Sequence, residues 1–552
     1  MDIVSQVKQA IEYTKVKDYK SAEKIYKNLL SLDKNNTTIL SLLGLMYFNS
    51  GKLKKAKLIL TKSNKLSPNN PTTIESLGFT YYNLGELKEA RKYFEQIINS
   101  TKNFEIYENY INCLFEIREN QKAYELGLKA NQLFPLNKDI LSVLVYACIY
   151  SGNLNDAIKY SKQLLSAFPK QAKSWLRQGL VQEVIFHDDR KAQECYKTAL
   201  KYGEKAEAYH NLAISYNKTG EFKKAEEYYK KLIKLNGLNK NNSFGLACTY
   251  FFQRKFKQGF KYYSMGHAFK NIDDTINKMK NFWDGKKYKD ETLFVYCDQG
   301  IGDCIMFSRY FGFLEKYFKE IKIACHPSML ELLKRSFKSS KKIKFYTYLK
   351  KFPKSDKMVI MSDLPYLLKM ETKFPLTNKY MVSDTKKENE YKEKYFKSDK
   401  LKVGIVWEAG AAGIREQLNR TLHISILDEI LNMQDIQFYS FQYKPALDDY
   451  KNYNNLIDIG SSFKNFDDTA AALKNLDVVI TVDTSVAHLA GALGIKTFML
   501  LPYCPDWRWF DNTKKTEWYD SMRIFKQTDH VFWDKEIEDI KTELLNLKVK
   551  TN

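Results

Sequence analysis

Residues 478–491 read VVITVDTSVAHLAG, and this stretch decides how the second half of the chain is interpreted. Its first five positions are uncharged and favour β-structure, which predicts a buried strand. Asp483, Thr484 and Ser485 are favourable N-cap residues, and the small apolar residues after them predict a helix. A parallel strand that enters a helix through so short a turn leaves backbone N–H groups free at the carboxyl edge of a sheet, where diphosphates commonly bind. We therefore interpret this stretch as an anion site for a nucleotide-linked donor.

The sequence around this stretch predicts a parallel α/β structure. Strand-like runs are expected at 292–297, 321–324, 343–346, 358–361, 402–407, 436–441, 456–459, 478–482 and 497–501. Helical or loop segments separate them, including a helix from 304 to about 318, and such alternation is typical of parallel sheets. The charged stretch 383–400 predicts a linker or helix between two lobes. An amphipathic helix at 534–548 is expected to cross back onto the first lobe.

Small residues recur through the first half of the chain at intervals of 33 to 35 residues. They are Ala22, Ala56, Ala90, Ala123, Ala157, Ala192, Ala225 and Gly259. Four glycines stand five residues before members of this series, namely Gly51, Gly85, Gly152 and Gly220. A period of this length is typical of stacked helix pairs, in which a glycine forms the turn and a small residue lets two helices approach.

This pattern resembles the tetratricopeptide repeat over roughly residues 3–270. The clearest units are 37–70 and 71–104, which carry Leu43-Gly44-x-x-Tyr47 and Leu77-Gly78-x-x-Tyr81. The resemblance implies a superhelix whose concave face binds an extended peptide, so we expect a protein partner there. The alternative is that the array serves only as a spacer or an oligomerisation surface.

Composition bounds the class of protein. The chain has 552 residues, 44% of them hydrophobic and 14% aromatic, which predicts two or three folded domains and excludes global disorder. The formal net charge of +23 could favour nucleic acid, anionic lipid or an acidic protein. The lysines are spread along predicted helices together with much Asn, Ile, Phe and Tyr. We therefore favour compositional bias over a basic binding surface and expect no nucleic-acid partner.

The cysteines and the N-terminus indicate the compartment. The eight cysteines include no C-x-x-C pair and mostly stand in apolar segments, which favours free thiols in a reducing compartment. Residues 1–6 begin an amphipathic helix without the features of a signal peptide, and no apolar run reaches the length of a membrane span. We expect a cytoplasmic protein without an integral membrane segment.

Motifs in the second half resemble those of glycosyltransferases. Gly300-Ile301-Gly302-Asp303 and Asp483-Thr484-Ser485-x-x-His488 are similar to heptosyltransferase motifs. The wider pattern resembles the bacterial tetratricopeptide-repeat glycosyltransferases through residues 299–303, 404–407, 419–422, 466–471 and 501–509. The resemblance covers about 290–530 and implies a GT-B architecture of two Rossmann-like lobes facing a cleft.

The expected fold is thus an α plus α/β chain, with a tetratricopeptide helical solenoid followed by a GT-B double-Rossmann domain. The predicted domains are a repeat array at 1–270, a linker at 271–290 that includes a short helix at 275–282, an acceptor lobe at 291–385, a donor lobe at 400–530 and a C-terminal helix at 531–552.

The resemblance implies that Asp303 is the general base of an inverting transfer, a role that suits a carboxylate bonded to an acceptor hydroxyl. The alternative is that Asp303 only caps its helix. Gly300 and Gly302 are expected to let the backbone approach the donor.

The turn at Asp483, Thr484 and Ser485 is expected to hold the donor diphosphate through backbone N–H groups. Ser485 replaces the glycine usual in heptosyltransferases. Asp483 would cap the turn or bind a sugar or ribose hydroxyl. His488 could donate to a phosphate or be a buried histidine whose hydrogen bonds are satisfied.

Two further residues are expected to contact the donor. Arg420 is the best candidate for a fixed cation on the leaving diphosphate, with a surface salt bridge as the alternative, and Arg415 and His423 are weaker candidates. Gln442, in the segment 441–443 after a strand, could meet the nucleobase. Residues 507–509 are equally compatible with core packing.

No metal or other cofactor is expected besides the nucleotide sugar as substrate, because the sequence offers no D-x-D at a strand end and no His/Cys cluster. Asp467 and Asp468 open a helix and are interpreted as an N-cap. The favoured function is a metal-independent glycosyltransferase with a protein acceptor on the repeats. The alternatives are a non-catalytic scaffold that binds nucleotide sugars and a transferase acting on a lipid-linked saccharide.

Overall fold

The computed structural model describes residues 2–268, 281–348, 353–372, 374–410, 420–443, 453–511, 514–529 and 532–551. The chain divides into two compact units, Met1–Ala208 and Tyr209–Asn552, and each is described by itself. The helix expected at 275–282 falls on residues that lie almost entirely outside the described ranges.

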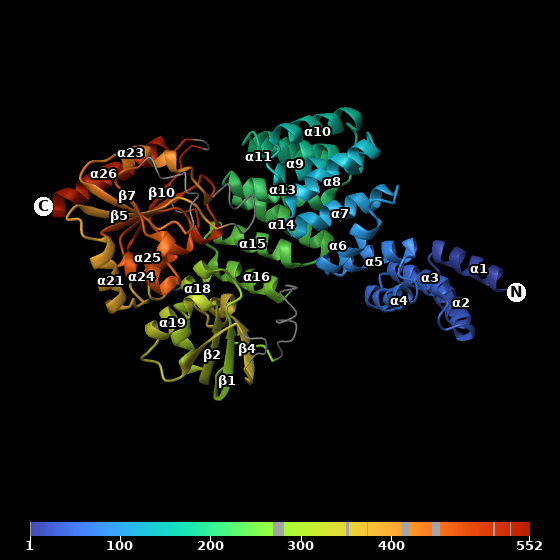
Figure 1. Cartoon of the computed structure of the whole chain (residues 1–552), viewed down its shortest axis with the longest axis horizontal. Coiled ribbons are helices and arrows are strands. Elements are labelled where there is room, and N and C mark those ends of the chain that lie inside the picture. Colours follow the sequence, from blue (N-terminus) through green and yellow to red (C-terminus); the bar gives the residue numbers. More distant parts are fainter. Residues whose placement is uncertain are drawn as a thin grey trace. The chain divides into compact units, whose positions relative to one another are not determined.

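The first unit consists of antiparallel helix pairs, drawn from blue to teal in Figure 1. Its helices are α1 (Ile3–Lys15), α2 (Tyr19–Leu32), α3 (Thr37–Asn49), α4 (Leu53–Leu66), α5 (Pro71–Asn83), α6 (Leu87–Ile97), α7 (Phe104–Glu116), α8 (Asn120–Leu133), α9 (Lys138–Tyr150), α10 (Leu154–Ala167), α11 (Ala172–Val184) and α12 (Asp189–Lys201). Helix α13 (Lys205–Lys218) spans the boundary, and α14 (Phe222–Asn236), α15 (Lys240–Phe252) and α16 (Phe256–Ala268) continue the pattern in the second unit.

The small residues of the sequence grid explain how each pair packs. The seven grid alanines are all fully buried, and each lies in the second helix of its pair. A Cβ atom at Gly44 would lie 2.5 Å from Leu60, and one at Gly179 would lie 2.5 Å from Tyr196, so these glycines let the paired helices touch. Gly51 and Gly85 form the turns with φ of 73° and 75°, which favours glycine. The predicted helical repeat is confirmed.

Asparagine side chains begin many first helices of the pairs. Asn36, Asn70, Asn103 and Asn137 each cap a helix by accepting a backbone N–H from its first turn. The caps fix where each pair starts, and thereby the interval between repeats.

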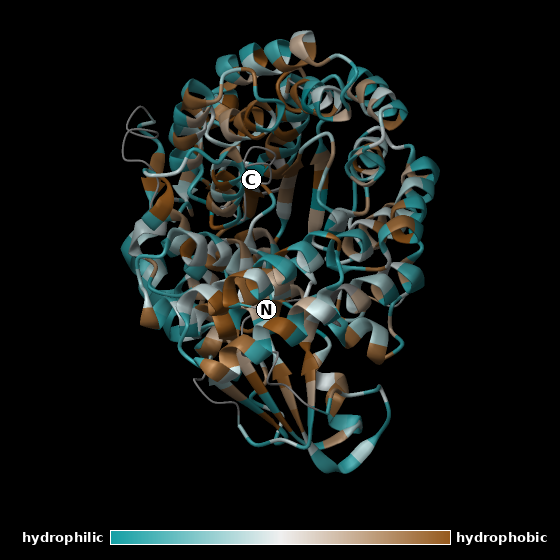
Figure 2. Ribbon diagram, turned by 90° about the vertical axis from the view of Figure 1, so that its right-hand side faces the viewer, coloured by the Kyte–Doolittle hydropathy of each residue, from teal (hydrophilic) through white to brown (hydrophobic). Residues whose placement is uncertain are grey.

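The first lobe of the second unit contains a four-stranded parallel sheet in the order β3-β2-β1-β4. Its strands are β1 (Tyr288–Tyr296), β2 (Phe318–Cys325), β3 (Ile343–Thr347) and β4 (Lys357–Ile360). Figure 2 shows several strands of this sheet brown toward their arrowheads, and in β1 the residues near that end are buried whereas those near its start are more exposed. The carboxyl end of β1 therefore enters the core and carries the turn into α18 (Ile301–Ser308) with it.

The second lobe contains a six-stranded parallel sheet in the order β10-β9-β8-β5-β6-β7. Its strands are β5 (Leu401–Val406), β6 (Ile436–Ser440), β7 (Leu456–Asp458), β8 (Val478–Thr481), β9 (Thr497–Leu501) and β10 (Met522–Lys526). Counted within the lobe, this is the order 3-2-1-4-5-6 of doubly wound nucleotide-binding sheets. The order reverses between β5 and β8, so their carboxyl ends border a crevice.

Alternate residues of these strands face two helical layers. Val478 and Ile480 share a core with Ile540 of α26 (Asp534–Thr551). Val479 packs on the other face in the core that contains Leu489 of α25 (Ser485–Ala492). Burial on both faces explains why β8 carries no charge and begins with three apolar residues. The predicted parallel α/β structure is confirmed.

Three expectations about elements need correction. The helix expected at 304–318 ends at Ser308; a 3₁₀ helix, η1 (Phe311–Lys316), follows, and Phe318 already begins β2. Strand β10 was not expected at all. Helix α26 does not cross back onto the first lobe, because its Lys541 and Lys548 pair with Glu429 and Asp435 of the second lobe.

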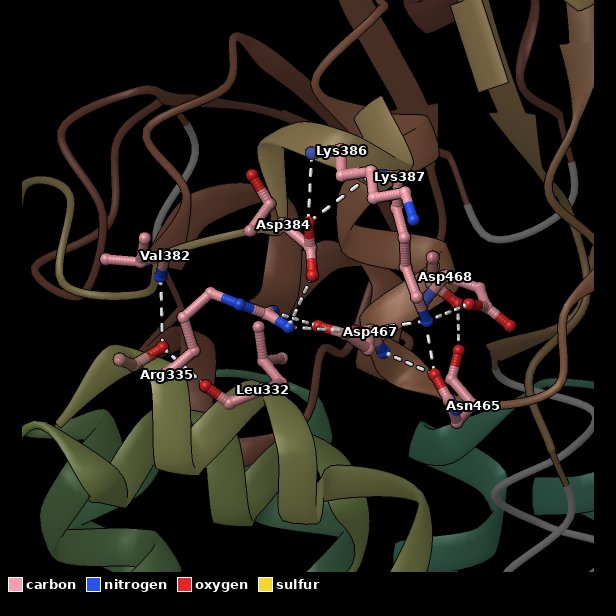
Figure 3. Close-up of polar contacts among 12 residues, drawn as sticks. Leu332, Arg335, Val382, Asp384, Lys386, Lys387, Asn465, Asp467 and Asp468 are labelled. Carbon is pink, nitrogen blue, oxygen red and sulfur yellow. Dashed lines mark hydrogen bonds and ion pairs between the residues drawn. The ribbon is translucent and has the colours of Figure 1, made fainter. Parts of the chain in front are cut away.

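An ion cluster joins the two lobes (Figure 3). Arg335, in α19 (Leu330–Ser336), pairs through both ends of its guanidinium with Asp467, in α24 (Phe466–Leu473), and with Asp384 at 3.0 Å. Lys387, in α21 (Thr385–Tyr395), adds contacts of 3.1 Å to Asp467 and 2.5 Å to Asp468. Burial opposes ionisation of Asp467, but Arg335 and Lys387 hold its pKa below the usual value. The N-cap of α24 is Asn465, so the N-cap interpretation of the aspartate pair was wrong.

In the portion of the chain that the structure describes, no helix is both long and apolar enough to span a bilayer.

Candidate functional site

A cavity of about 1350 Å³ lies within the second unit, where the strands of both sheets end. The turns after β1, β5, β6, β8 and β9 contribute to its walls, and so do side chains of α13, α14 and α15. Parallel α/β sheets bind ligands at such carboxyl ends, at the point where the strand order reverses. All the residues predicted to form the site line this cavity: Asp303, Gly300, Gly302, Arg420, Asp483, Thr484, Ser485, His488 and Gln442.

Asp303 lies in the first turn of α18, and its side chain is 9% exposed. The N-cap of this helix is Gly300, and no side chain caps it, so the capping role considered for Asp303 is not observed. Its carboxylate instead accepts two hydrogen bonds from Arg508, at 2.7 Å from Nε and 2.9 Å from Nη2. The carboxylate therefore belongs to an ion pair between the two lobes.

The two glycines of this turn differ in what they permit. A Cβ atom at Gly302 would lie 2.9 Å from His488 Cδ2 and 3.5 Å from the Cα of Ser485, so only glycine lets α18 approach α25 this closely. A Cβ atom at Gly300 would meet nothing within 4 Å. Gly302 thus brings the predicted acceptor turn into contact with the predicted donor turn.

Thr484 caps α25 by accepting the N–H of Ala487 at 3.4 Å. Ser485 is the first residue of the helix, and its N–H, like that of Val486, has no partner within the helix. This arrangement suits an anion, as the sequence predicted.

Asp483 is 2% exposed, and neither of its carboxylate oxygens has a hydrogen-bond partner of good geometry among the described residues. Nε of Arg420 lies 3.1 Å from Oδ2, a contact by charge rather than a well-directed hydrogen bond. Burial raises the pKa of Asp483 even though Arg420 opposes the shift. A ligand hydroxyl donating to Asp483 would relieve this deficit.

Arg420 donates to the backbone carbonyl of Asp483 from Nε at 3.0 Å and from Nη2 at 2.6 Å. Its guanidinium therefore braces the turn after β8. The surface salt bridge considered for it is not observed, because its partner is in the cavity wall. Arg415 lies outside the described residues, and His423 is exposed and does not line the cavity.

His488 is the buried histidine that the sequence left as one possibility. Its ring is 3% exposed, stacks on Trp509 at 5.2 Å between centroids, and has Nδ1 2.9 Å from the hydroxyl of Tyr519. Burial lowers its pKa well below the usual value, and Arg508, Arg420 and Arg309 lower it further. The imidazole is therefore neutral at neutral pH.

Gln442, in the loop after β6, forms hydrogen bonds to the loop after β5. Its side chain accepts the N–H of Glu408 at 3.1 Å and donates to the carbonyl of Glu408 at 3.2 Å. A Cβ atom at Gly460 would lie 2.2 Å from the carbonyl oxygen of Gln442, so this backbone crossing requires glycine. Gln442 shapes the cavity wall through the loop after β5.

Sequence reasoning missed Arg508, which it left as possible core packing. The guanidinium lies over the ring of Trp507 at 4.8 Å and reaches Asp506 at 2.6 Å as well as Asp303. Burial opposes the charge of Arg508, but Asp303 and Asp506 raise its pKa well above the usual value. The only local signal was an arginine in an aromatic loop directly after a buried strand.

No three His, Cys, Asp or Glu side chains within the described ranges gather as a metal site would require.

Two family models match segments of the helical part of the chain. The model of the anaphase-promoting complex, cyclosome, subunit 3 family matches residues 15–97, and that of the tetratricopeptide repeat matches residues 206–237. Protein FlbA of Caulobacter vibrioides is 22% identical over 293 residues, which are 48% of this chain and 48% of FlbA. The chain thus spans about half the length of this curated relative.

Among solved structures, a tetratricopeptide repeat protein from Parabacteroides merdae is 16% identical, with 45% of this chain and 98% of that chain covered and a TM-score of 0.41. Yeast Tom70 is 15% identical, with 46% of this chain and 56% of that chain covered and a TM-score of 0.37. The matched repeat models and the helix pairs together show that the N-terminal half contains tetratricopeptide repeats.

Proposed function

We propose that the chain is a glycosyltransferase that moves a sugar from a nucleotide-sugar donor to a protein held by the repeats. The observation that carries the proposal is the contact between the Gly302 turn of one parallel sheet and the Ser485 turn of the other. This contact puts a carboxylate, Asp303, in the same cavity as a helix N-terminus that would suit an anion. A two-lobed GT-B arrangement would bring acceptor and donor together in this way.

The proposed reaction is metal-independent and inverting. Asp303 would take the proton of an acceptor hydroxyl while the oxygen of that hydroxyl bonds to the anomeric carbon of the donor sugar. The bond from the anomeric carbon to the diphosphate oxygen breaks at the same time. The electron pair leaves with the nucleoside diphosphate, whose charge the start of α25 and the arginines of the cavity would stabilise. The carboxylate of Asp483 would accept a hydrogen bond from a hydroxyl of the sugar or ribose, and its oxygens would then be satisfied.

The acceptor assignment rests on the repeats, because tetratricopeptide arrays commonly bind protein segments. The reaction would occur in the cytoplasm, since the structure forms no disulfide between the eight cysteines, all of which it describes, as is usual in reducing compartments.

The test is turnover of a panel of UDP-, GDP-, ADP- and dTDP-sugars, followed by release of the nucleoside diphosphate. We expect Asp303→Asn to lower turnover by about 10²–10⁴-fold, the usual contribution of a general base. Asp290→Asn, an exposed aspartate in β1, is the matched control and should keep full turnover. Equal turnover in the wild type and Asp303→Asn would remove Asp303 as the base.

A non-catalytic scaffold that binds nucleotide sugars is the second candidate, and the ion pair between Asp303 and Arg508 favours it, since Arg508 already occupies both oxygens of that carboxylate. Tight nucleotide-sugar binding without transfer or hydrolysis would support this candidate.

A further inference from the structure

Arg508 connects the two predicted halves of the reaction. It belongs to η6 (Trp507–Trp509) after β9 of the second lobe, and it reaches Asp303 in α18 of the first lobe. Both oxygens of Asp303 accept hydrogen bonds from its guanidinium, so the ion pair occupies both of them. The side chain is 16% exposed and lines the cavity.

The guanidinium of Arg508 suits a diphosphate as well as it suits a carboxylate. Its planar fork donates two parallel hydrogen bonds to either group, and a diphosphate carries the greater negative charge. The ring of Trp507 lies under it at 4.8 Å, and Trp507 itself stacks on Phe251 of α15 at 4.7 Å. This support keeps the guanidinium at the cavity wall whichever anion it binds.

The other arginine of the cavity is engaged differently. Arg420 donates twice to the carbonyl oxygen of Asp483 and thereby holds the turn that forms the site. If it left, that turn would lose two hydrogen bonds. Arg508 has anionic partners on two sides, Asp303 and Asp506, and can give up the first while it keeps the second.

We propose that Arg508 exchanges its partner during the reaction, binding Asp303 before the nucleotide arrives and the donor diphosphate afterwards. The exchange frees both oxygens of Asp303, so the base becomes available only when the donor is in place. An acceptor hydroxyl would then be activated only beside a bound donor, which prevents unproductive proton transfer and orders the binding of the two substrates. The activation of the acceptor rests on the proposed function, whereas the exchange of partners by Arg508 requires only that a diphosphate binds in the cavity.

Calorimetric titration of the full chain with ADP, CDP, GDP, UDP and dTDP measures the exchange without any need for turnover. Arg508→Ala should weaken binding of the preferred diphosphate by about tenfold or more, the usual worth of a charged hydrogen-bonding partner. Asp303→Asn should strengthen binding several-fold, because Arg508 no longer has to leave a carboxylate. A purely structural ion pair would instead give a loss of affinity, or no change, in both variants, and would overturn the proposal.

The double variant separates exchange from general electrostatics. If Arg508 carries the effect, Asp303→Asn has no effect on affinity in the Arg508→Ala background. If Asp303→Asn strengthens binding equally in the Arg508→Ala background, the effect comes only from removing a negative charge, and the proposal fails. Arg508→Lys, which keeps the charge but not the fork, gives an intermediate affinity and serves if Arg508→Ala does not fold.

Arg523→Ala is the matched control, since Arg523 lies in the same lobe, pairs with Glu543 and does not line this cavity. It should bind nucleoside diphosphates as the wild type does. Wild-type protein that binds none of the five diphosphates would overturn the exchange. Binding with the expected signs but without sugar transfer would support the exchange and count against the glycosyltransferase.

Discussion

Nδ1 of His488 and the hydroxyl of Tyr519 lie 2.9 Å apart inside the second unit, and this contact holds the imidazole in one orientation. The pKa of His488 is lowered well below its usual value, first by burial and then by three arginines. A histidine that stays neutral when folded, but titrates at about 6.5 when unfolded, makes stability depend on pH.

The folded protein should therefore lose stability as the pH falls below about 6.5, because only the unfolded chain takes up this proton. The slope from His488 is up to about 1.4 kcal/mol per pH unit. Thermal unfolding of the wild type and His488→Asn between pH 5 and 7.5 measures it, and the variant should lack this part of the slope. His423→Asn, an exposed histidine at the start of a 3₁₀ helix, should keep it. Parallel curves for wild type and His488→Asn would contradict the expectation.

Gly491 of α25 faces the ring of Tyr519. A Cβ atom there would lie 2.4 Å from the ring, so Gly491→Ala should destabilise the second unit by about 1–3 kcal/mol through overpacking. Gly312→Ala is the control, because a Cβ atom at Gly312 would meet nothing within 4 Å. Denaturant titration compares the two variants, and equal midpoints would show that the ring can move aside.

A buried ion pair stabilises the end of the first unit. Arg177, 5% exposed, pairs with Glu207 at 2.5 Å, lies over the ring of Tyr146 at 4.0 Å, and donates to Ser142 at 2.8 Å. Arg177→Met should lower the free energy of unfolding by about 1–3 kcal/mol. This is less than for a fully buried pair, because the Glu207 side chain is 30% exposed and solvent screens its charge. Urea unfolding of the full chain and of this variant measures this cost.

The same pair gives a pH test with a definite sign. Burial opposes ionisation of Glu207, but Arg177 holds its pKa below the usual value. Its contribution is therefore fully present above about pH 4.5 and is lost as the pH falls through the lowered value. The difference in stability between wild type and Glu207→Gln should shrink as the pH is lowered from 6 to 4. A difference that grew on acidification would refute this reading of the pair.

The ion cluster of Figure 3 should stabilise the contact between the two lobes. Among the described residues, Arg335→Met leaves Lys387 as the remaining charged partner of Asp467, which is 2% exposed, and should cost about 1–3 kcal/mol in the second unit. Glu538→Gln, which removes an exposed pair with Lys541, should change stability by less than about 0.5 kcal/mol. Thermal unfolding distinguishes them, and limited proteolysis near residue 384 should accelerate only in Arg335→Met.

Local patterns predicted most of the fold. The regularly spaced alanines predicted the repeats correctly, because each repeat needs a small residue where its two helices meet, as Ala56 and Gly44 show. Nine of the ten strands among the described residues were expected, because each contains several apolar residues close together. Strand β10 was missed because its run is short and is flanked by Arg523 and Lys526, and its register comes from β9 rather than from its own pattern.

The candidate site was predictable only in part. Asp303, the glycines and the turn after β8 stand in short motifs, and all of them line one cavity. The partner of Asp303 could not be predicted, because Arg508 is 205 residues away and no local pattern connects the two. The role of Arg420 also depends on tertiary structure, since it braces the carbonyl of Asp483 across 63 residues.

The stack of Phe251 on Trp507 limits how such a chain can be recombined. Phe251 belongs to a repeat helix, yet it supports the loop that carries Arg508, and the compact unit that contains both begins at Tyr209. The last repeats are therefore part of the cavity's framework, and the α/β lobes are not a module that begins at residue 291. An exchange of arrays between relatives, made to change the protein that we propose the array binds, would have to join the chains near residue 208 and leave α14, α15 and α16 with the lobes.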